Sequence, residues 1–219
     1  MTQTYDDRSV SKVEVSGAEA RHYDFFMNTI TVGTYPFFIR KAIREMEIQP
    51  GHEILVLGCG TGRNLALMDK HLNGEGRIVG LDIGPEMLAQ SQRRFADVPH
   101  VTIKDQRIDE PLPYENEFDK VFISFVLHGF IQEDREKIIA NAQRALRPGG
   151  EFVILDYNEF DLEHASLLVR FAFKMECPLA TDFIGRDLQA ILREQGFDEF
   201  RVHPHYLGYV RLLAARKAE

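Results

Sequence analysis

Three glycines and one aspartate are the residues whose types and spacing most clearly suggest ligand chemistry. Gly58, Gly60 and Gly62 follow an apolar run over residues 54–57, and Asp82 ends a second apolar run. Glycine lets the backbone approach a ligand closely and adopt positive φ, so these glycines predict a main-chain cradle. A carboxylate about 20 residues beyond such a turn is typical of the ribose-binding acid of nucleotide-binding βαβ units.

His128 is the candidate for acid–base chemistry, because it follows an expected strand over residues 118–124 and should face the same cleft as the glycines. Imidazole titrates near neutral pH and could remove a proton from a bound acceptor or orient it. The alternative interpretation is a packed or capping histidine. The histidines and the two cysteines, Cys59 and Cys177, have no spacing typical of metal ligands, so no metal is expected.

The elements that would position these residues alternate between strands and helices after Gly51. Strands are expected at residues 53–57, 77–82, 100–104, 118–124, 150–156, 198–204 and 207–215. Helices are expected near residues 62–72, 85–96, 132–146 and 183–195. This alternation predicts an α/β fold with a Rossmann-like, doubly wound, seven-stranded sheet and helices on both faces. The turn before the last strand is too short for a crossover, so that strand should be antiparallel in a mostly parallel sheet.

Two segments fall outside this pattern. Residues 18–47 are rich in aromatic side chains and predict a helical cap, preceded by a loose polar arm over residues 1–16. Residues 157–181 carry apolar side chains at mostly helical spacing, which indicates either core packing or a lid. Because no linker or internal repeat interrupts the sequence, we expect a single domain over residues 1–219.

The composition excludes some classes of partner. The net charge is −8 and no basic run occurs, so nucleic-acid binding is not expected and a small molecule is the favoured partner. No apolar run reaches the ~20 residues needed to cross a bilayer, and no signal peptide is visible, which indicates a cytoplasmic protein. The sequence does not decide whether the protein contacts a membrane transiently to reach an apolar substrate. It does not decide the oligomeric state either.

Five motifs in order resemble those of class I S-adenosylmethionine-dependent methyltransferases. They lie at residues 55–62, 80–82, 85–88, 112–119 and 146–150. The Tyr23-Asp24 pair and the chain length are most similar to the ubiquinone/menaquinone-biosynthesis C-methyltransferase group, also called methyltransferase type 11. The resemblance implies S-adenosylmethionine as the cofactor. It also implies methyl transfer to a small, apolar or aromatic acceptor such as a quinone precursor.

The resemblance further implies which residues bind the cofactor. They are Gly58, Cys59, Gly60, Gly62, Asp82, Ile83, Met87, Asp105, Gln106, Ser124, Phe125 and Tyr23. Among them, Asp82 would accept hydrogen bonds from the ribose hydroxyls, a task that suits a group with acceptors only. Ile83 and Met87 would pack on the adenine, and Asp105 would bind its amino group. Ser124 and Phe125 would face the methionyl part of the cofactor and the acceptor.

Two positions depart from the family pattern. Val56 stands where the family usually has an acidic residue, and Lys104 stands where the closest relatives commonly have glycine. Two alternatives therefore stay open: a phospholipid or small-amine N-methyltransferase, and a noncatalytic S-adenosylmethionine-binding regulatory protein. A nicotinamide-dependent oxidoreductase would share the ribose carboxylate, but the Gly-x-Gly-x-Gly spacing and the expected final hairpin disfavour it.

Overall fold

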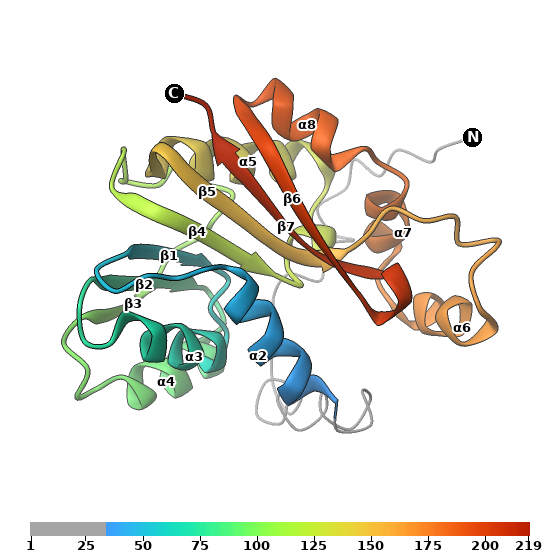
Figure 1. The fold of residues 1–219 in the computed structure, drawn as a ribbon. Helices are drawn as coiled ribbons and strands as arrows, with labels where there is room; N and C mark the ends of the chain where they lie inside the picture. The colour runs from blue at the N-terminus through green and yellow to red at the C-terminus, as the bar shows by residue number, and fades with distance from the viewer. Residues whose placement is uncertain (1–33) are drawn as a thin grey trace.

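The computed structural model describes residues 34–219, which contain a seven-stranded sheet in the order β3-β2-β1-β4-β5-β7-β6 (Figure 1). The strands are β1 (Glu53–Leu57), β2 (Arg77–Asp82), β3 (Val101–Asp105), β4 (Phe118–Ser124), β5 (Leu146–Tyr157), β6 (Phe197–His205) and β7 (Val210–Lys217). The first five pair in parallel, whereas β7 is antiparallel to both β5 and β6. The predicted Rossmann-like sheet with one antiparallel strand is therefore confirmed.

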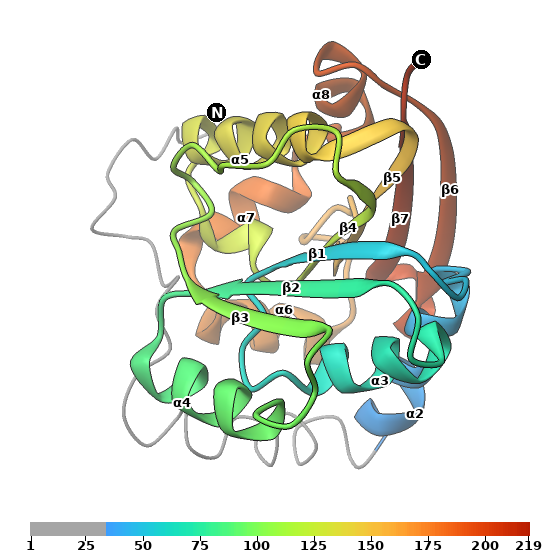
Figure 2. The same cartoon turned by 90° about the vertical axis from the view of Figure 1, so that its left-hand side faces the viewer.

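Helices cover both faces of the sheet. They are α2 (Tyr35–Glu45), α3 (Arg63–Leu72), α4 (Pro85–Arg94), α5 (Gln132–Ala145), α6 (Leu167–Met175), α7 (Pro178–Ile184) and α8 (Leu188–Glu194), with short 3-10 turns η2 (Leu127–Gly129) and η3 (Tyr206–Gly208). Figure 2 shows α2, α3 and α4 on one face and α5, α7 and α8 on the other. In the part of the chain that the structure describes, no helix is long and apolar enough to span a membrane.

The core lies in two layers because successive side chains of a strand point to opposite faces. Along β1, Ile54 and Val56 pack toward α2 and α3, while Leu55 and Leu57 pack toward α5. All four side chains are buried. This burial explains why the central parallel strand is a continuous apolar run rather than an alternating one.

Some expected boundaries are wrong. The helix expected over residues 183–195 is two helices, because Gly185 ends α7 and the Asp187 side chain caps the start of α8. Strand β5 begins at Leu146 rather than residue 150, since the chain joins the sheet directly after α5. Strand β7 begins at Val210 rather than residue 207, because Leu207 has a left-handed φ of 58° in the turn.

The two segments outside the pattern are buried to different extents: α2 packs in the core, whereas much of α6 is exposed. Helix α2 is the described part of the expected cap, whereas the arm over residues 1–16 and Tyr23 lie outside the described residues. In α6, Leu167, Leu168 and Phe171 are 81%, 77% and 61% exposed, so core packing is the wrong interpretation for these three side chains. Phe173 is the buried member of this stripe and packs against Tyr157.

Candidate functional site

A pocket lies at the carboxyl ends of β1, β2 and β4 and contains about 1130 Å³ of space that includes open solvent. The predicted residues that line it are Gly58, Cys59, Gly60, Asp82, Ile83, Met87, Gln106, Ser124, Phe125 and His128. The structure thus brings most of the predicted site residues together in the crevice where open α/β sheets bind ligands.

The glycine turn leaves its backbone open toward this pocket. Gly58 has φ of +72°, and a Cβ atom there would lie 2.8 Å from the Val126 side chain, so another residue would displace the loop after β4. A Cβ atom added at Gly60 would meet no atom within 4 Å. Gly62 is not among the pocket-lining residues and instead lies against the ring of Phe95, which indicates a packing requirement.

The carboxylate of Asp82 holds the turn in place. Its Oδ2 accepts a hydrogen bond from the Gly60 N–H at 2.7 Å. Its Oδ1 accepts from the N–H groups of Ile83 and Gly84, both at 2.9 Å. A carboxylate offers about four acceptor positions, so these three bonds leave capacity for a ligand hydroxyl. Asp82 therefore joins the ends of β1 and β2 and still faces the pocket.

The residues after β3 contribute more to the pocket than Asp105 itself. Asp105 is exposed and is not among the pocket-lining residues of the described chain. The Gln106 N–H donates to the Asp82 carbonyl at 3.0 Å, which brings the following residues against the pocket. Among these is Asp109, a buried carboxylate that accepts from Arg107 at 2.8 Å. Sequence reasoning missed Asp109, which lies in a loop without a motif.

Cys59 contributes its backbone rather than a reactive thiol. Its N–H donates to the Leu81 carbonyl at 2.8 Å, so the turn continues the pairing of β1 with β2. Burial raises the pKa of the Cys59 thiol, and the nearby Asp82 carboxylate raises it further. The thiol therefore stays protonated at neutral pH and is a poor nucleophile.

The loop after β4 supplies polar and aromatic groups. Asn64 donates to the Ser124 hydroxyl at 3.1 Å, linking α3 to the end of β4. Phe125 has a left-handed φ of 51°, a strained conformation for a non-glycine residue that is held by its N–H bond to the Leu155 carbonyl. Tyr35 of α2 also lines the pocket, so at least one cap aromatic reaches the site.

His128 forms a buried pair with Asp156 at the end of β5. The His128 Nδ1 lies 2.7 Å from Asp156 Oδ1, and the His128 backbone N–H donates to Asp156 Oδ2 at 3.2 Å. Burial alone would lower the pKa of His128, but the Asp156 carboxylate outweighs burial and raises it. Because the carboxylate only accepts, Nδ1 carries the proton and Nε2 is the atom available to a ligand.

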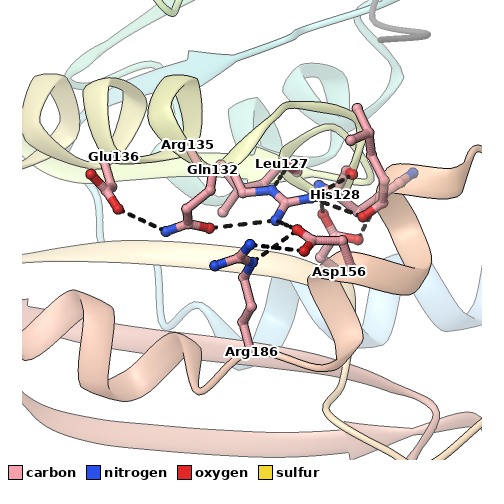
Figure 3. Close-up of polar contacts among 9 residues, drawn as sticks. Leu127, His128, Gln132, Arg135, Glu136, Asp156 and Arg186 are labelled. Carbon is pink, nitrogen blue, oxygen red and sulfur yellow. Dashed lines mark hydrogen bonds and ion pairs between the residues drawn. The ribbon is translucent and has the colours of Figure 1, made fainter. Parts of the chain in front are cut away.

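Buried Arg135 holds the loop of His128 against α7 (Figure 3). Its guanidinium donates to the carbonyl oxygens of Leu127 at 3.3 Å and His128 at 3.2 Å. It also donates to the Leu179 carbonyl at 2.9 Å and the Asp182 carboxylate at 2.7 Å. Sequence reasoning missed this residue, because an arginine within an amphipathic helix normally indicates the solvent face.

Comparisons with known proteins agree with this geometry. Residues 54–150 match the family model of the methyltransferase domain. The uncharacterized methyltransferase sll0829 of Synechocystis sp. is 30% identical over 190 residues, which are 86% of each chain. The ubiquinone/menaquinone biosynthesis C-methyltransferase UbiE of Methylococcus capsulatus is 27% identical over 85% of this chain and 75% of that protein. A methyltransferase structure from Aquifex aeolicus shares the fold, with a TM-score of 0.62 at 18% identity over 81% of this chain and 88% of that one.

The chain belongs to the class I S-adenosylmethionine-dependent methyltransferases, and S-adenosylmethionine is its cofactor. The residues present fit this molecule. The turn at Gly60 is open to the pocket, and Asp82 lines the pocket with acceptor capacity left. The apolar side chains of Ile83 and Met87 lie beside that carboxylate, as an adenosine group requires.

Proposed function

We propose that this methyltransferase acts on a small, apolar or aromatic acceptor such as a quinone precursor. The observation that carries the proposal is the aromatic character of the pocket beyond the glycine turn. Tyr35, Phe125 and Phe130 line it, and Phe38 packs behind Phe125 at a ring distance of 6.3 Å. Flat aromatic side chains favour a flat, apolar ligand through offset or edge contacts. The similarity to UbiE of Methylococcus capsulatus supports the same acceptor class.

We assign cofactor binding to the opposite side of the pocket. S-adenosylmethionine supplies an electrophilic methyl group attached to a positively charged sulfur. The residues assigned to binding it all line the pocket, namely Gly58, Cys59, Gly60, Asp82, Ile83, Met87, Gln106 and Ser124. Gly62 and Asp105 do not line the pocket and are not included, and Phe125 is assigned to the acceptor side. In this assignment Asp82 holds the ribose, and Ile83 with Met87 covers the adenine. Exclusion of water by these side chains aligns the reacting groups and protects the methyl donor.

We assign His128 to the acceptor. Its Nδ1 is occupied by Asp156, which fixes the orientation of the ring in the pocket wall. The remaining nitrogen, Nε2, can orient an acceptor hydroxyl or take up its proton. The residue therefore acts on the acceptor rather than on the cofactor. Its replacement should lower the rate of methyl transfer and leave cofactor affinity unchanged.

A panel of acceptors tests the proposed substrate class. Purified protein is incubated with S-adenosylmethionine and a short-chain demethylated quinol, phosphoethanolamine or a small primary amine. The products are identified by mass spectrometry. We expect S-adenosylhomocysteine and a methylated product with the quinol. Methylation of an amine in preference to the quinol would overturn the proposal. Tight cofactor binding without methylation of any acceptor would indicate a noncatalytic protein instead.

Replacement of Asp82 tests the cofactor assignment. Loss of charge-assisted hydrogen bonds to the ribose in Asp82→Ala should weaken S-adenosylmethionine binding by about 2–3 kcal/mol in titration calorimetry. Asp97→Ala, an exposed acid in the loop before β3, is the matched control and should bind normally. Circular dichroism checks that the turn has not unfolded, since Asp82 also bonds the backbone. Unchanged affinity in folded Asp82→Ala would refute the assignment.

A further inference from the structure

Three side chains of metal-ligating types converge on one wall of the pocket. His128 belongs to η2, and Glu176 and Cys177 belong to the link between α6 and α7. One potential ligand atom of each lies within 4.8 Å of the other two. We propose that His128, Glu176 and Cys177 bind a divalent metal ion of the zinc class, which holds the methyl acceptor. Because the metal would hold the methyl acceptor, this proposal rests on the proposed function.

The ligand set matches the chemistry of zinc. Zinc takes nitrogen, oxygen and sulfur ligands in tetrahedral geometry, and catalytic sites use three protein ligands with a fourth position open. The three residues provide one ligand of each kind and face the pocket, where an acceptor could occupy the fourth position. No metal was expected from the sequence, because the ligands come from distant segments without a spacing motif.

The groups that hydrogen-bond to His128 and Glu176 are of the kind that support the ligands of a metal site. Asp156 accepts from His128 Nδ1 at 2.7 Å, which leaves Nε2 as the ligand atom and makes it more basic. The Tyr157 hydroxyl donates to Glu176 Oε2 at 2.8 Å, and the Cys177 N–H donates to Oε1 at 2.9 Å. Each carboxylate oxygen keeps a second acceptor position, so Glu176 can bind a metal without losing these bonds.

The required movement is small. Zinc bonds of about 2.0–2.3 Å bring tetrahedral ligand atoms to roughly 3.3–3.8 Å from one another. The three atoms must therefore approach one another by up to about 1.5 Å, a distance that side-chain rotation provides. The backbone on both sides is already fixed, because Arg135 bonds the His128 carbonyl in η2 and the Leu179 carbonyl in α7. Such a supporting shell is what precise metal sites need.

A metal in this position would make an acceptor more nucleophilic. An acceptor hydroxyl that binds in the fourth position loses its proton to the solvent, and its oxygen stays as an anionic ligand. A bound divalent zinc ion lowers the pKa of such a group by several units. His128 would then orient the acceptor through the metal instead of taking up its proton, so no protein base would be needed to ionise the acceptor.

Cobalt substitution tests the site in the full-length protein. Wild-type protein is stripped with a chelator, loaded with cobalt(II) and examined by absorption spectroscopy. Zinc stoichiometry is measured separately by mass spectrometry after dialysis. We expect one zinc ion per chain, intense tetrahedral cobalt bands and a near-ultraviolet thiolate-to-cobalt charge-transfer band. Absence of stoichiometric zinc, or cobalt spectra without the thiolate band, would overturn the proposal without any variant.

Variants identify the ligands. Cys177→Ser should abolish the thiolate band, and His128→Ala and Glu176→Gln should each lower zinc affinity by at least about tenfold. Cys59→Ser and His164→Ala are matched controls, because Cys59 is the other buried cysteine and His164 is exposed. Both controls should keep the wild-type spectrum. Zinc affinity that is unchanged in Cys177→Ser and His128→Ala would overturn the assignment.

The metal site and the proposed function can fail separately. If chelator-treated protein that contains no zinc methylates the quinol at the wild-type rate, the metal proposal falls and the acceptor class stands. If zinc binds as expected but the quinol is not methylated, the acceptor class falls and the metal site stands. Titration of S-adenosylmethionine into zinc-free protein should give the wild-type affinity, because no proposed ligand belongs to the cofactor side.

Discussion

Replacement of Arg135 by methionine should destabilise the protein and release the loop of His128 from α7. Methionine fills a similar volume without charge, so the loss of packing is small. The variant removes the bonds to three carbonyl groups, those of Leu127, His128 and Leu179, and one of the two arginine partners of Asp182.

The structure sets the size of the effect. Breaking a buried ion pair costs about 3–5 kcal/mol when the remaining charge has no partner. Here Arg186 still donates twice to Asp182, both at 2.8 Å, so the cost on the carboxylate is smaller. Each buried carbonyl group that loses its Arg135 donor adds about 1 kcal/mol, less for that of Leu127, which keeps the Phe130 N–H at 3.3 Å. Together these effects give an expected loss of about 3–5 kcal/mol.

Urea unfolding followed by circular dichroism measures this loss. The matched control is Arg186→Met, which removes the other arginine of the same carboxylate. Because the Arg186 side chain is 27% exposed and bonds no carbonyl of η2, its loss should cost only about 1 kcal/mol. Arg135→Met should also reduce methyl transfer while S-adenosylmethionine affinity stays normal. Equal losses of stability in the two variants, or a loss below about 1 kcal/mol in Arg135→Met, would refute the reasoning.

Three further predictions concern other parts of the fold. Val56→Asp should lower the free energy of unfolding by more than about 3 kcal/mol in urea titrations, because residue 56 is buried in an apolar cluster; retained stability would show that the family acid is tolerated there. Hydrogen exchange of residues 157–181 should slow when S-adenosylhomocysteine and an acceptor analogue are added, since α6 exposes Leu168 and Phe171 as a closing lid would. Phe171→Ala should then reduce turnover more than cofactor affinity, and equal protection in both states would contradict the lid. Burial raises the pKa of Asp182, but Arg186 and Arg135 outweigh burial and hold the pKa below its ordinary value. The stability advantage of wild type over Asp182→Asn should therefore be full above about pH 5 and disappear as the pH falls through the lowered pKa.

The side of the pocket that we assign to the cofactor could be predicted to come together because its signals are local in the sequence. The apolar run of β1, the glycine turn and the carboxylate at the end of β2 lie within one βαβ unit, residues 53–82. The right-handed crossover of such a unit follows from chain connectivity alone, and it places the carboxyl ends of both strands at the same edge of the sheet. The position of Asp82 beside Gly60 was therefore available from spacing, although its three backbone bonds were not.

The predicted boundaries of helices and strands that were wrong depended on single residues. Periodicity predicts one helix over residues 183–195, but the cap formed by Asp187 starts a new helix there. The exposure of α6 could not be predicted either, since an apolar stripe at helical spacing looks the same in a core helix and in a lid. Only the tertiary position of the helix distinguishes the two.

Beyond His128, Ser124 and Phe125, the side of the pocket that we assign to the acceptor could not be predicted, because it is built from contacts between distant segments. His128 lies in η2, Asp156 in β5 and Cys177 in the link between α6 and α7, and each has an ordinary structural interpretation when considered alone. Their proximity depends on buried Arg135, which joins the loop after β4 to α7. The division has a functional consequence. Under the proposed assignment each group of residues holds a different reactant. Substitutions within residues 58–82 should then act mainly on cofactor affinity, whereas substitutions around Arg135 should act mainly on the rate of transfer.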